Sequence, residues 1–115
     1  MGNHWEDLVS RTVIGARGAP VIAVLHGFGQ RISSRWWQFR RNDFASMSGI
    51  LDDCRRRGWT CWMPQARNRN WTTSQMSDWK GMTESCKRAT GRDDLPFLMG
   101  LSDGATAVAS MLFRQ

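Results

Sequence analysis

Three short apolar runs constrain the fold of this 115-residue chain more than any other feature. Residues 21–25 are uninterrupted Val, Ile, Ala and Leu, residues 59–63 are β-prone and stop at Pro64, and residues 95–99 precede Gly100. An apolar run of this length without polar alternation is typical of a strand covered on both faces, as in a parallel sheet. We therefore predict strands near residues 21–26, 59–63 and 95–99.

Helical patterns separate these runs. After Ser102 the chain is rich in Ala, and two earlier stretches carry apolar residues spaced three and four apart, which gives a helix one apolar stripe. The order strand, helix, strand, helix, strand, helix predicts an α/β fold: a three-layer α/β/α arrangement with a short parallel sheet and right-handed crossovers. Residues 1–19 form a polar lead-in with a short strand near 12–14, and residues 20–115 form the one domain. The first stripe is Phe44, Met47, Leu51 and Cys54, and the second is Met76, Trp79, Met82 or Thr83, and Cys86.

Two glycine-flanked motifs follow the first and third runs. The first is His26-Gly27-Phe28-Gly29, and the second, over residues 100–104, reads G-x-S-x-G. A serine in the second pattern, placed after a strand and before a helix, sits on a sharp turn that exposes its hydroxyl. Gly100 and Gly104 relieve the crowding between the two elements. The alternative is a Gly- and Ser-rich loop that only caps the helix.

The two motifs supply complementary chemistry. Ser102 is the candidate nucleophile, and the backbone N–H groups of Phe28 and Asp103 are positioned by the motifs to stabilise an oxyanion. His26, at the end of a strand, is expected to be a hydrogen-bonding brace rather than a base, and His4 in the lead-in is expected to be incidental. Gly27-Phe28-Gly29 does not complete the G-x-G-x-x-G pattern of a dinucleotide-binding site, because Ile32 occupies the position of the third glycine.

On these motifs, residues 20–115 resemble the N-terminal half of the α/β-hydrolase family, in particular its serine esterases. The resemblance implies a carboxylic-ester hydrolase that transfers an acyl group through Ser102, with a small-molecule ester as substrate and no cofactor or metal. It also implies that the loop beside the oxyanion hole lines a substrate pocket, the alternative being ordinary packing under a loop. The aromatic residues of this loop are Trp36, Trp37 and Phe39.

The family places its acid and its histidine after the serine, and no histidine follows Ser102 here. We therefore expect a hydrolase domain that ends just after the nucleophile elbow, completed by further residues or truncated, with base and acid absent from these 115 residues. The alternative is a non-catalytic remnant or a small α/β interaction protein. In either case the strand at 95–99 becomes a sheet edge, and an exposed apolar edge favours self-association.

Composition and charge limit the kinds of partner that we expect for this chain. The net charge is +6, with arginines near several of the seven tryptophans, a combination that can bind nucleic acid; no run of five like charges occurs, so we do not expect a nucleic-acid partner.

Cys54, Cys61 and Cys86 form no zinc pattern and fit reduced thiols in a cytoplasmic protein. Residues 1–11 lack the apolar core of a signal peptide, and no apolar stretch is long enough to span a membrane.

Overall fold

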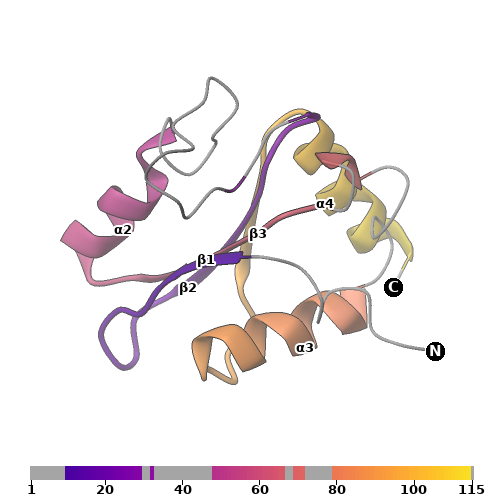
Figure 1. The fold of residues 1–115 in the computed structure, drawn as a ribbon. Helices are drawn as coiled ribbons and strands as arrows, with labels where there is room; N and C mark the ends of the chain where they lie inside the picture. Colours follow the sequence, from indigo (N-terminus) through magenta and orange to yellow (C-terminus); the bar gives the residue numbers. More distant parts are fainter. Residues whose placement is uncertain (1–9, 30–31, 33–47, 67–68, 72–78, 115) are drawn as a thin grey trace.

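The computed structural model describes residues 10–29, 32, 48–66, 69–71 and 79–114. Four strands form one sheet in the order β1-β3-β2-β4 (Figure 1). The strands are β1 (Ser10–Val13), β2 (Val21–Leu25), β3 (Thr60–Pro64) and β4 (Phe97–Gly100). The helices are α2 (Ile50–Arg57), α3 (Trp79–Thr90) and α4 (Asp103–Arg114). The α/β class predicted from the alternating pattern is confirmed.

The three strands predicted from the apolar runs are parallel to one another. β2 pairs with β3 through Val21↔Thr60 and with β4 through Leu25↔Gly100. The prediction of a purely parallel sheet is corrected by β1, which pairs antiparallel with β3. β1 comes from the lead-in, spans Ser10–Val13 rather than residues 12–14, and makes the sheet mixed. β1 forms one edge of the sheet, beside β3. It is therefore not a neighbour of β2, the strand that follows it in the chain.

The sheet is covered on both faces because alternate residues of each strand point to opposite sides. α3 and α4 lie on one face and α2 lies on the other (Figure 1). The α3–α4 side is packed around Trp62 and Met111, and the α2 side around Val24 and Leu51. The clusters are Val21, Ala23, Leu25, Trp62, Ala66, Trp71, Met82, Cys86, Ala107 and Met111, and Val13, Val24, Ile32, Leu51, Cys54, Cys61 and Met63.

The helix stripes are borne out where the structure describes them. Leu51 and Cys54 are buried in α2, and Met82 and Cys86 are buried in α3. α2 begins at Ile50, directly after Gly49, whose left-handed backbone (φ 72°) marks the helix start, and it ends at Gly58 (φ 70°). The earlier parts of both predicted stripes, Phe44, Met47 and Met76, lie outside the described residues.

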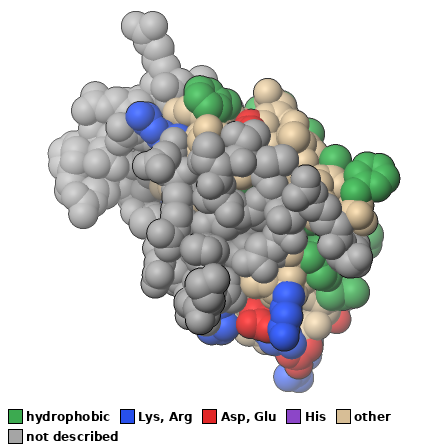
Figure 2. All heavy atoms as spheres, turned by 90° about the vertical axis from the view of Figure 1, so that its right-hand side faces the viewer, with side chains coloured by type: hydrophobic (Ala, Val, Ile, Leu, Met, Phe, Trp, Pro, Cys, Tyr) green, Lys and Arg blue, Asp and Glu red, His purple; other side chains and the backbone are tan. Residues whose placement is uncertain are grey.

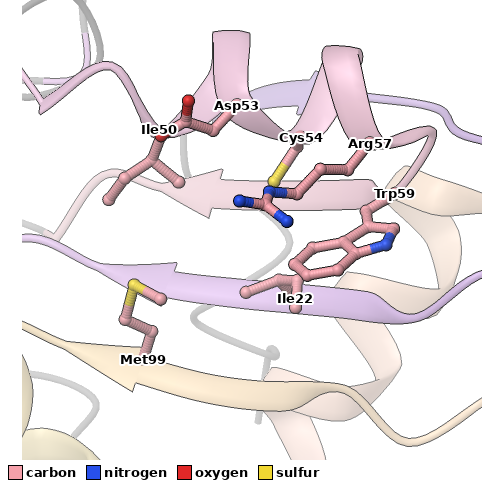
Figure 3. Close-up of a pocket in the computed structure, with 7 residues that line it drawn as sticks. All are labelled: Ile22, Ile50, Asp53, Cys54, Arg57, Trp59 and Met99. Carbon is pink, nitrogen blue, oxygen red and sulfur yellow. The ribbon is translucent and has the colours of Figure 1, made fainter.

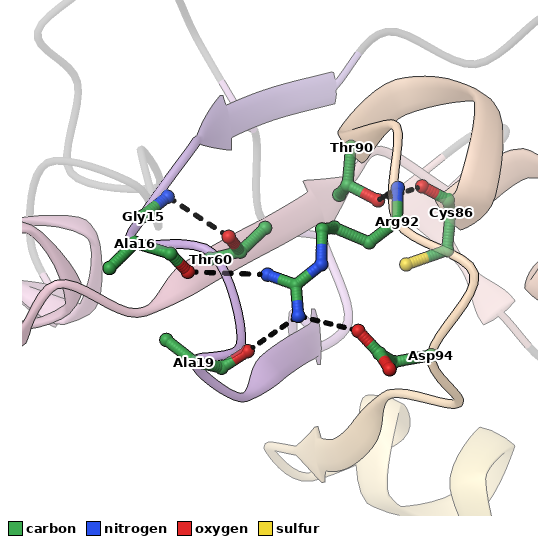
Figure 4. Close-up of polar contacts among 8 residues, drawn as sticks. All are labelled: Gly15, Ala16, Ala19, Thr60, Cys86, Thr90, Arg92 and Asp94. Carbon is green, nitrogen blue, oxygen red and sulfur yellow. Dashed lines mark hydrogen bonds and ion pairs between the residues drawn. The ribbon is translucent and has the colours of Figure 1, made fainter.

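An arginine anchors the segment that leads into β4. The Arg92 guanidinium donates hydrogen bonds to the backbone oxygens of Ala19 at 2.9 Å and Ala16 at 3.4 Å, and it pairs with Asp94 (Figure 4). The turn at Ala16 is itself tied to β3, since Gly15 N–H donates to the Thr60 hydroxyl at 2.9 Å. These contacts hold the start of β4 against the turn that precedes β2, and so help to place β4 beside β2.

Among the described residues, no helix has the length and apolar character needed to cross a membrane.

Candidate active site

The pairing of β2 with β4 brings the two glycine motifs together. Leu25 and Gly100 are partners at the ends of two neighbouring parallel strands. The next residues of each strand, His26-Gly27-Phe28 and Leu101-Ser102-Asp103, therefore leave the sheet at the same edge. The N–H of Leu101 also donates to the Leu25 oxygen at 3.1 Å, which extends the pairing into the turn.

Ser102 occupies a strained position between β4 and α4. Its φ is +55°, a left-handed conformation that a residue with a side chain rarely adopts. In the described segments Arg69 is the one other non-glycine residue with positive φ. Such outliers persist where the surrounding structure holds them and cluster at functional sites. The Ser102 side chain is exposed at this turn, directly before the first residue of α4.

The two flanking glycines sit where no side chain would fit. A Cβ on Gly100 would lie 2.4 Å from the Gly104 oxygen, and a Cβ on Gly104 would lie 2.0 Å from the Leu25 oxygen. Both obstacles are backbone atoms, which cannot move aside as a flexible side chain can. The turn at Ser102 is thus packed directly onto the end of β2, so the position of the serine backbone is fixed relative to the first motif.

Two backbone N–H groups at this edge belong to the residues that the sequence predicts as an oxyanion hole. Asp103 is the first residue of α4, where N–H groups have no intrahelical acceptor and the helix dipole favours negative charge. Phe28 follows Gly27 at the end of β2, and the next N–H, that of Gly29, donates to the Arg69 oxygen at 2.8 Å. Neither the Asp103 nor the Phe28 N–H donates to another residue within the described part of the chain.

His26 is a buried brace, as its position at a strand end predicts. Its side chain is 0% exposed. Nδ1 lies 2.7 Å from the Gly27 oxygen, and Nε2 accepts the Ala66 N–H at 3.0 Å and lies 3.1 Å from the Gln65 amide nitrogen. These partners require a neutral ring with its proton on Nδ1. Burial lowers the pKa of His26, against the opposing effects of the Gly27 hydrogen bond and the Asp103 charge. Both ring nitrogens are engaged, so His26 is not placed to take a proton from Ser102.

Trp71 links the two motifs. Its indole Nε1–H donates to the His26 oxygen at 2.8 Å, and its backbone N–H donates to a carboxylate oxygen of Asp103 at 2.7 Å. Its ring also lies 5.1 Å from that of His26 and is fully buried. The indole and the Asp103 carboxylate therefore hold the α4 N-terminus at a fixed place beside the end of β2.

Sequence reasoning missed Trp71 and Gln65 as supports of the site. Gln65 reaches across to His26 and also accepts the Ile32 N–H at 2.6 Å. Both residues follow β3, which is the other neighbour of β2. Their position in the sequence was the available clue. Residues that directly follow a parallel strand lie at the same edge of the sheet as the residues that follow the neighbouring strands. Trp36, Trp37, Phe39 and His4, which the sequence also singled out, lie outside the described residues.

The cysteine thiols are not candidate nucleophiles. Cys54, Cys61 and Cys86 are all free and buried. Burial raises the pKa of Cys86 to about 12 and raises that of Cys61 still further, with the neighbouring Cys54 as a second cause. A thiol with so high a pKa stays protonated at neutral pH and is a weak nucleophile. Ser102 is therefore the strongest candidate among the described residues.

A groove of about 320 Å³ lies away from this edge, on the α2 face of the sheet. Its walls are α2, β2 and β4, with Ile22 and Met99 from the strands and the Arg57 guanidinium stacked 5.2 Å above the Trp59 ring (Figure 3). Ser102 and Asp103 do not line it. In the part of the chain that the structure describes, no three His, Cys, Asp or Glu side chains are grouped to hold a metal ion.

No family model, no curated protein and no solved structure matches this chain.

Proposed function

We propose that this chain carries the nucleophile and the oxyanion hole of a serine hydrolase that acts on carboxylic esters. The observation that carries the proposal is the backbone of Ser102, which is held at φ +55° between β4 and α4 while Gly104 packs on the end of β2. A serine on a strained strand-to-helix turn, flanked by glycines, is the arrangement that nucleophile elbows use.

The fold supports the same proposal. Three parallel strands carry helices on both faces, and the two motifs leave the sheet at the carboxyl ends of adjacent strands. We take this as the part of a three-layer α/β-hydrolase fold that ends just after the elbow. The buried, free thiols suit a reducing, cytoplasmic setting.

In the proposed reaction, the Ser102 oxygen attacks the ester carbonyl carbon while its proton passes to a general base. The carbonyl oxygen becomes an oxyanion and accepts hydrogen bonds from the N–H groups of Phe28 and Asp103. Collapse of this intermediate breaks the bond to the alcohol oxygen, which takes the proton from the base. Water then attacks the acyl group on Ser102 by the same route and releases the acid.

The general base and its acid come from outside the described residues in this proposal. His26 is excluded by its burial and by the partners of both ring nitrogens. The exposed Leu101 directly precedes Ser102, and the exposed Phe28 follows the end of β2, the strand that pairs with β4. Both apolar side chains favour an apolar acyl group. Trp36, Trp37 and Phe39 stay the candidate lining of the acyl pocket.

The test is ester hydrolysis by the product of the complete open reading frame that encodes these residues. With p-nitrophenyl acetate and p-nitrophenyl butyrate as substrates, we expect Ser102→Ala to lower kcat/KM by about a thousandfold or more, because the nucleophile is lost. Ser110→Ala, a matched serine deletion within α4, is expected to leave kcat/KM within about twofold.

Two results would contradict the proposal. One is an unchanged rate in Ser102→Ala, and the other is an equal loss in Ser110→Ala, which would point to damage to the fold. Circular dichroism spectra and thermal melts of both variants separate a loss of chemistry from a loss of structure.

A further inference from the structure

The peptide unit that carries the Phe28 N–H is held through its carbonyl oxygen. That oxygen belongs to Gly27, and it lies 2.7 Å from Nδ1 of the His26 ring. A peptide unit is planar, and in a trans peptide such as this one the C=O and the N–H point in opposite directions. A hydrogen bond that fixes the direction of the Gly27 carbonyl therefore also fixes the direction of the Phe28 N–H.

The surroundings of Nε2 decide which nitrogen of the His26 ring carries the proton. Nε2 accepts the Ala66 N–H at 3.0 Å, and the Gln65 amide nitrogen, which is also a donor, lies 3.1 Å from it. The orientation of the Gln65 amide is set because its oxygen accepts the Ile32 N–H at 2.6 Å. With two donors facing Nε2, the neutral ring carries its proton on Nδ1 and donates it to the Gly27 oxygen.

The peptide units before and after this one are held by other partners. The His26 oxygen accepts the Trp71 Nε1–H at 2.8 Å, and the Gly29 N–H donates to the Arg69 oxygen at 2.8 Å. Three consecutive peptide units thus each have a hydrogen-bond partner, and the partner of the middle unit is the His26 ring. Removing the Nδ1–H donor alone should release the middle unit while its neighbours stay held.

His26 can act on a substrate only through the backbone that it holds. Its side chain is 0% exposed, and no part of it is visible on the face of the molecule in Figure 2. A carbonyl that accepts a hydrogen bond also polarises its own peptide unit, so that the N–H at the other end becomes a stronger donor. The bond from Nδ1 to the Gly27 oxygen therefore affects both the direction and the strength of the Phe28 N–H.

We propose that neutral His26 is a positioning residue of the oxyanion hole: its Nδ1–H holds the Gly27 carbonyl and thereby directs the Phe28 N–H at the oxyanion. This inference rests on the proposed function, which makes that N–H a donor to the intermediate. The two ring nitrogens then have separate tasks. Nδ1 sets the oxyanion donor, and Nε2 anchors the ring to the segment that follows β3.

Two substitutions separate these tasks. The amide nitrogen of Asn lies as close to the backbone as Nδ1 does, so His26→Asn can keep the donor to Gly27 but loses the acceptor for the Ala66 N–H. The amide of Gln lies one bond further out, near the position of Nε2, so His26→Gln can keep that acceptor but loses the donor to Gly27. Both variants lose the ring, and thermal melts establish whether their stabilities match.

The first readout does not depend on activity. Gly27-Phe28 is the one Gly-Phe pair in these 115 residues, so glycine labelled with ¹³C at the carbonyl and ¹⁵N-labelled phenylalanine select the NMR signal of this peptide unit. The signal is assigned in the product of the complete reading frame by its loss in Phe28→Leu. In His26→Gln we expect the order parameter of the Phe28 amide to fall from about 0.85 to about 0.6 or below, and in His26→Asn to stay near the wild-type value.

The second readout is hydrolysis of p-nitrophenyl acetate. His26→Gln should lower kcat by at least about tenfold, a part of the loss of 10²–10³ that removal of a whole oxyanion donor causes, and should change KM by no more than about twofold, because the donor acts on the intermediate. His26→Asn should restore kcat to within about threefold of wild type. A purely structural role would instead lower kcat in step with stability in both variants.

An unchanged Gly27-Phe28 signal in His26→Gln, or equal kcat in the two variants, would overturn this inference while Ser102-dependent hydrolysis by the wild type upholds the proposed function. Absence of Ser102-dependent hydrolysis in the wild type would overturn both. Should neither variant fold, ¹⁵N shifts of the wild-type His26 ring decide the matter. We expect the proton on Nδ1, and a proton on Nε2 would contradict the proposal.

Discussion

The side of β4 that faces β2 and the side that faces away from the sheet differ in how closely other groups approach them. On the inner side, Leu101 N–H bonds to the Leu25 oxygen, and Gly104 lies so near the same oxygen that no Cβ would fit. On the outer side, no described strand pairs with the β4 backbone. The side chains of Phe97 and Met99, which lie on the α2 face of β4, are exposed. Close backbone packing at the turn that follows β4 thus adjoins exposed apolar side chains on the strand itself.

This difference separates two roles. The inner side fixes Ser102 relative to the N–H groups at the end of β2, and a site that stabilises charge in a transition state needs such fixed geometry. The outer side contributes nothing to that geometry. Substitutions on the inner side should therefore reduce stability more than substitutions of the exposed residues of β4.

The largest effect is expected from Gly104→Ala. The added Cβ would meet the Leu25 oxygen at 2.0 Å, so α4 and β2 would have to separate. Overpacking against backbone of this kind should lower the free energy of unfolding by about 3 kcal/mol, measured by urea denaturation.

Gly91→Ala is the control for this prediction. Gly91 has a left-handed backbone but open space around its Cβ position, so the same substitution should cost only about 1 kcal/mol. Equal losses in the two variants would show that β2 and the Ser102 turn are not in backbone contact.

A smaller contrast is expected between neighbouring residues of β4. Leu98 packs against the core on the α4 side, whereas Met99 is 47% exposed on the α2 side. Leu98→Ala should lower the free energy of unfolding by about 2 kcal/mol, and Met99→Ala by about 0.5 kcal/mol or less. Both are measured by urea denaturation. A loss in Met99→Ala as large as that in Leu98→Ala would mean that the α2 face of β4 is covered.

The smallest effect that we predict is a loss of stability as the pH falls. Burial lowers the pKa of His26 below its usual 6.5 in the folded chain, so the unfolded chain binds the proton first as the pH falls. The contribution of neutral His26 to the free energy of unfolding is therefore fully present above pH 6.5 and declines as the pH falls below that value. We expect the free energy of unfolding to decrease between about pH 7 and about pH 5.

His26→Gln should flatten this pH dependence, and His4→Gln should retain it. Urea denaturation at a series of pH values measures both variants. A slope that persists in His26→Gln and disappears in His4→Gln would contradict the assignment of His26 as the buried, neutral brace of the inner side.

The inner side of β4 could be predicted from sequence to a large extent. Glycines two residues on either side of Ser102 are a local pattern with a steric cause, and the apolar runs fix three strands by their length and lack of alternation. The lining residues Trp36, Trp37 and Phe39 stay a prediction.

Features that depend on topology could not be predicted. The direction of β1 is set by its place beyond β3, and a short run of Thr and Val carries no sign of direction. Trp71 and Gln65 contact His26 across about forty intervening residues, so their role appears only once β3 is known to lie beside β2. The start of α2 depends on the backbone of Gly49, where an apolar stripe alone suggested an earlier beginning.

The role of Ser102 is best tested by mass-spectrometric mapping of a fluorophosphonate adduct on the product of the complete reading frame. We expect one adduct, on Ser102, that forms in wild-type protein and in Ser110→Ala and is absent from Ser102→Ala. An adduct on a different residue, or none on a protein that hydrolyses esters, would contradict the assignment of Ser102 as the nucleophile.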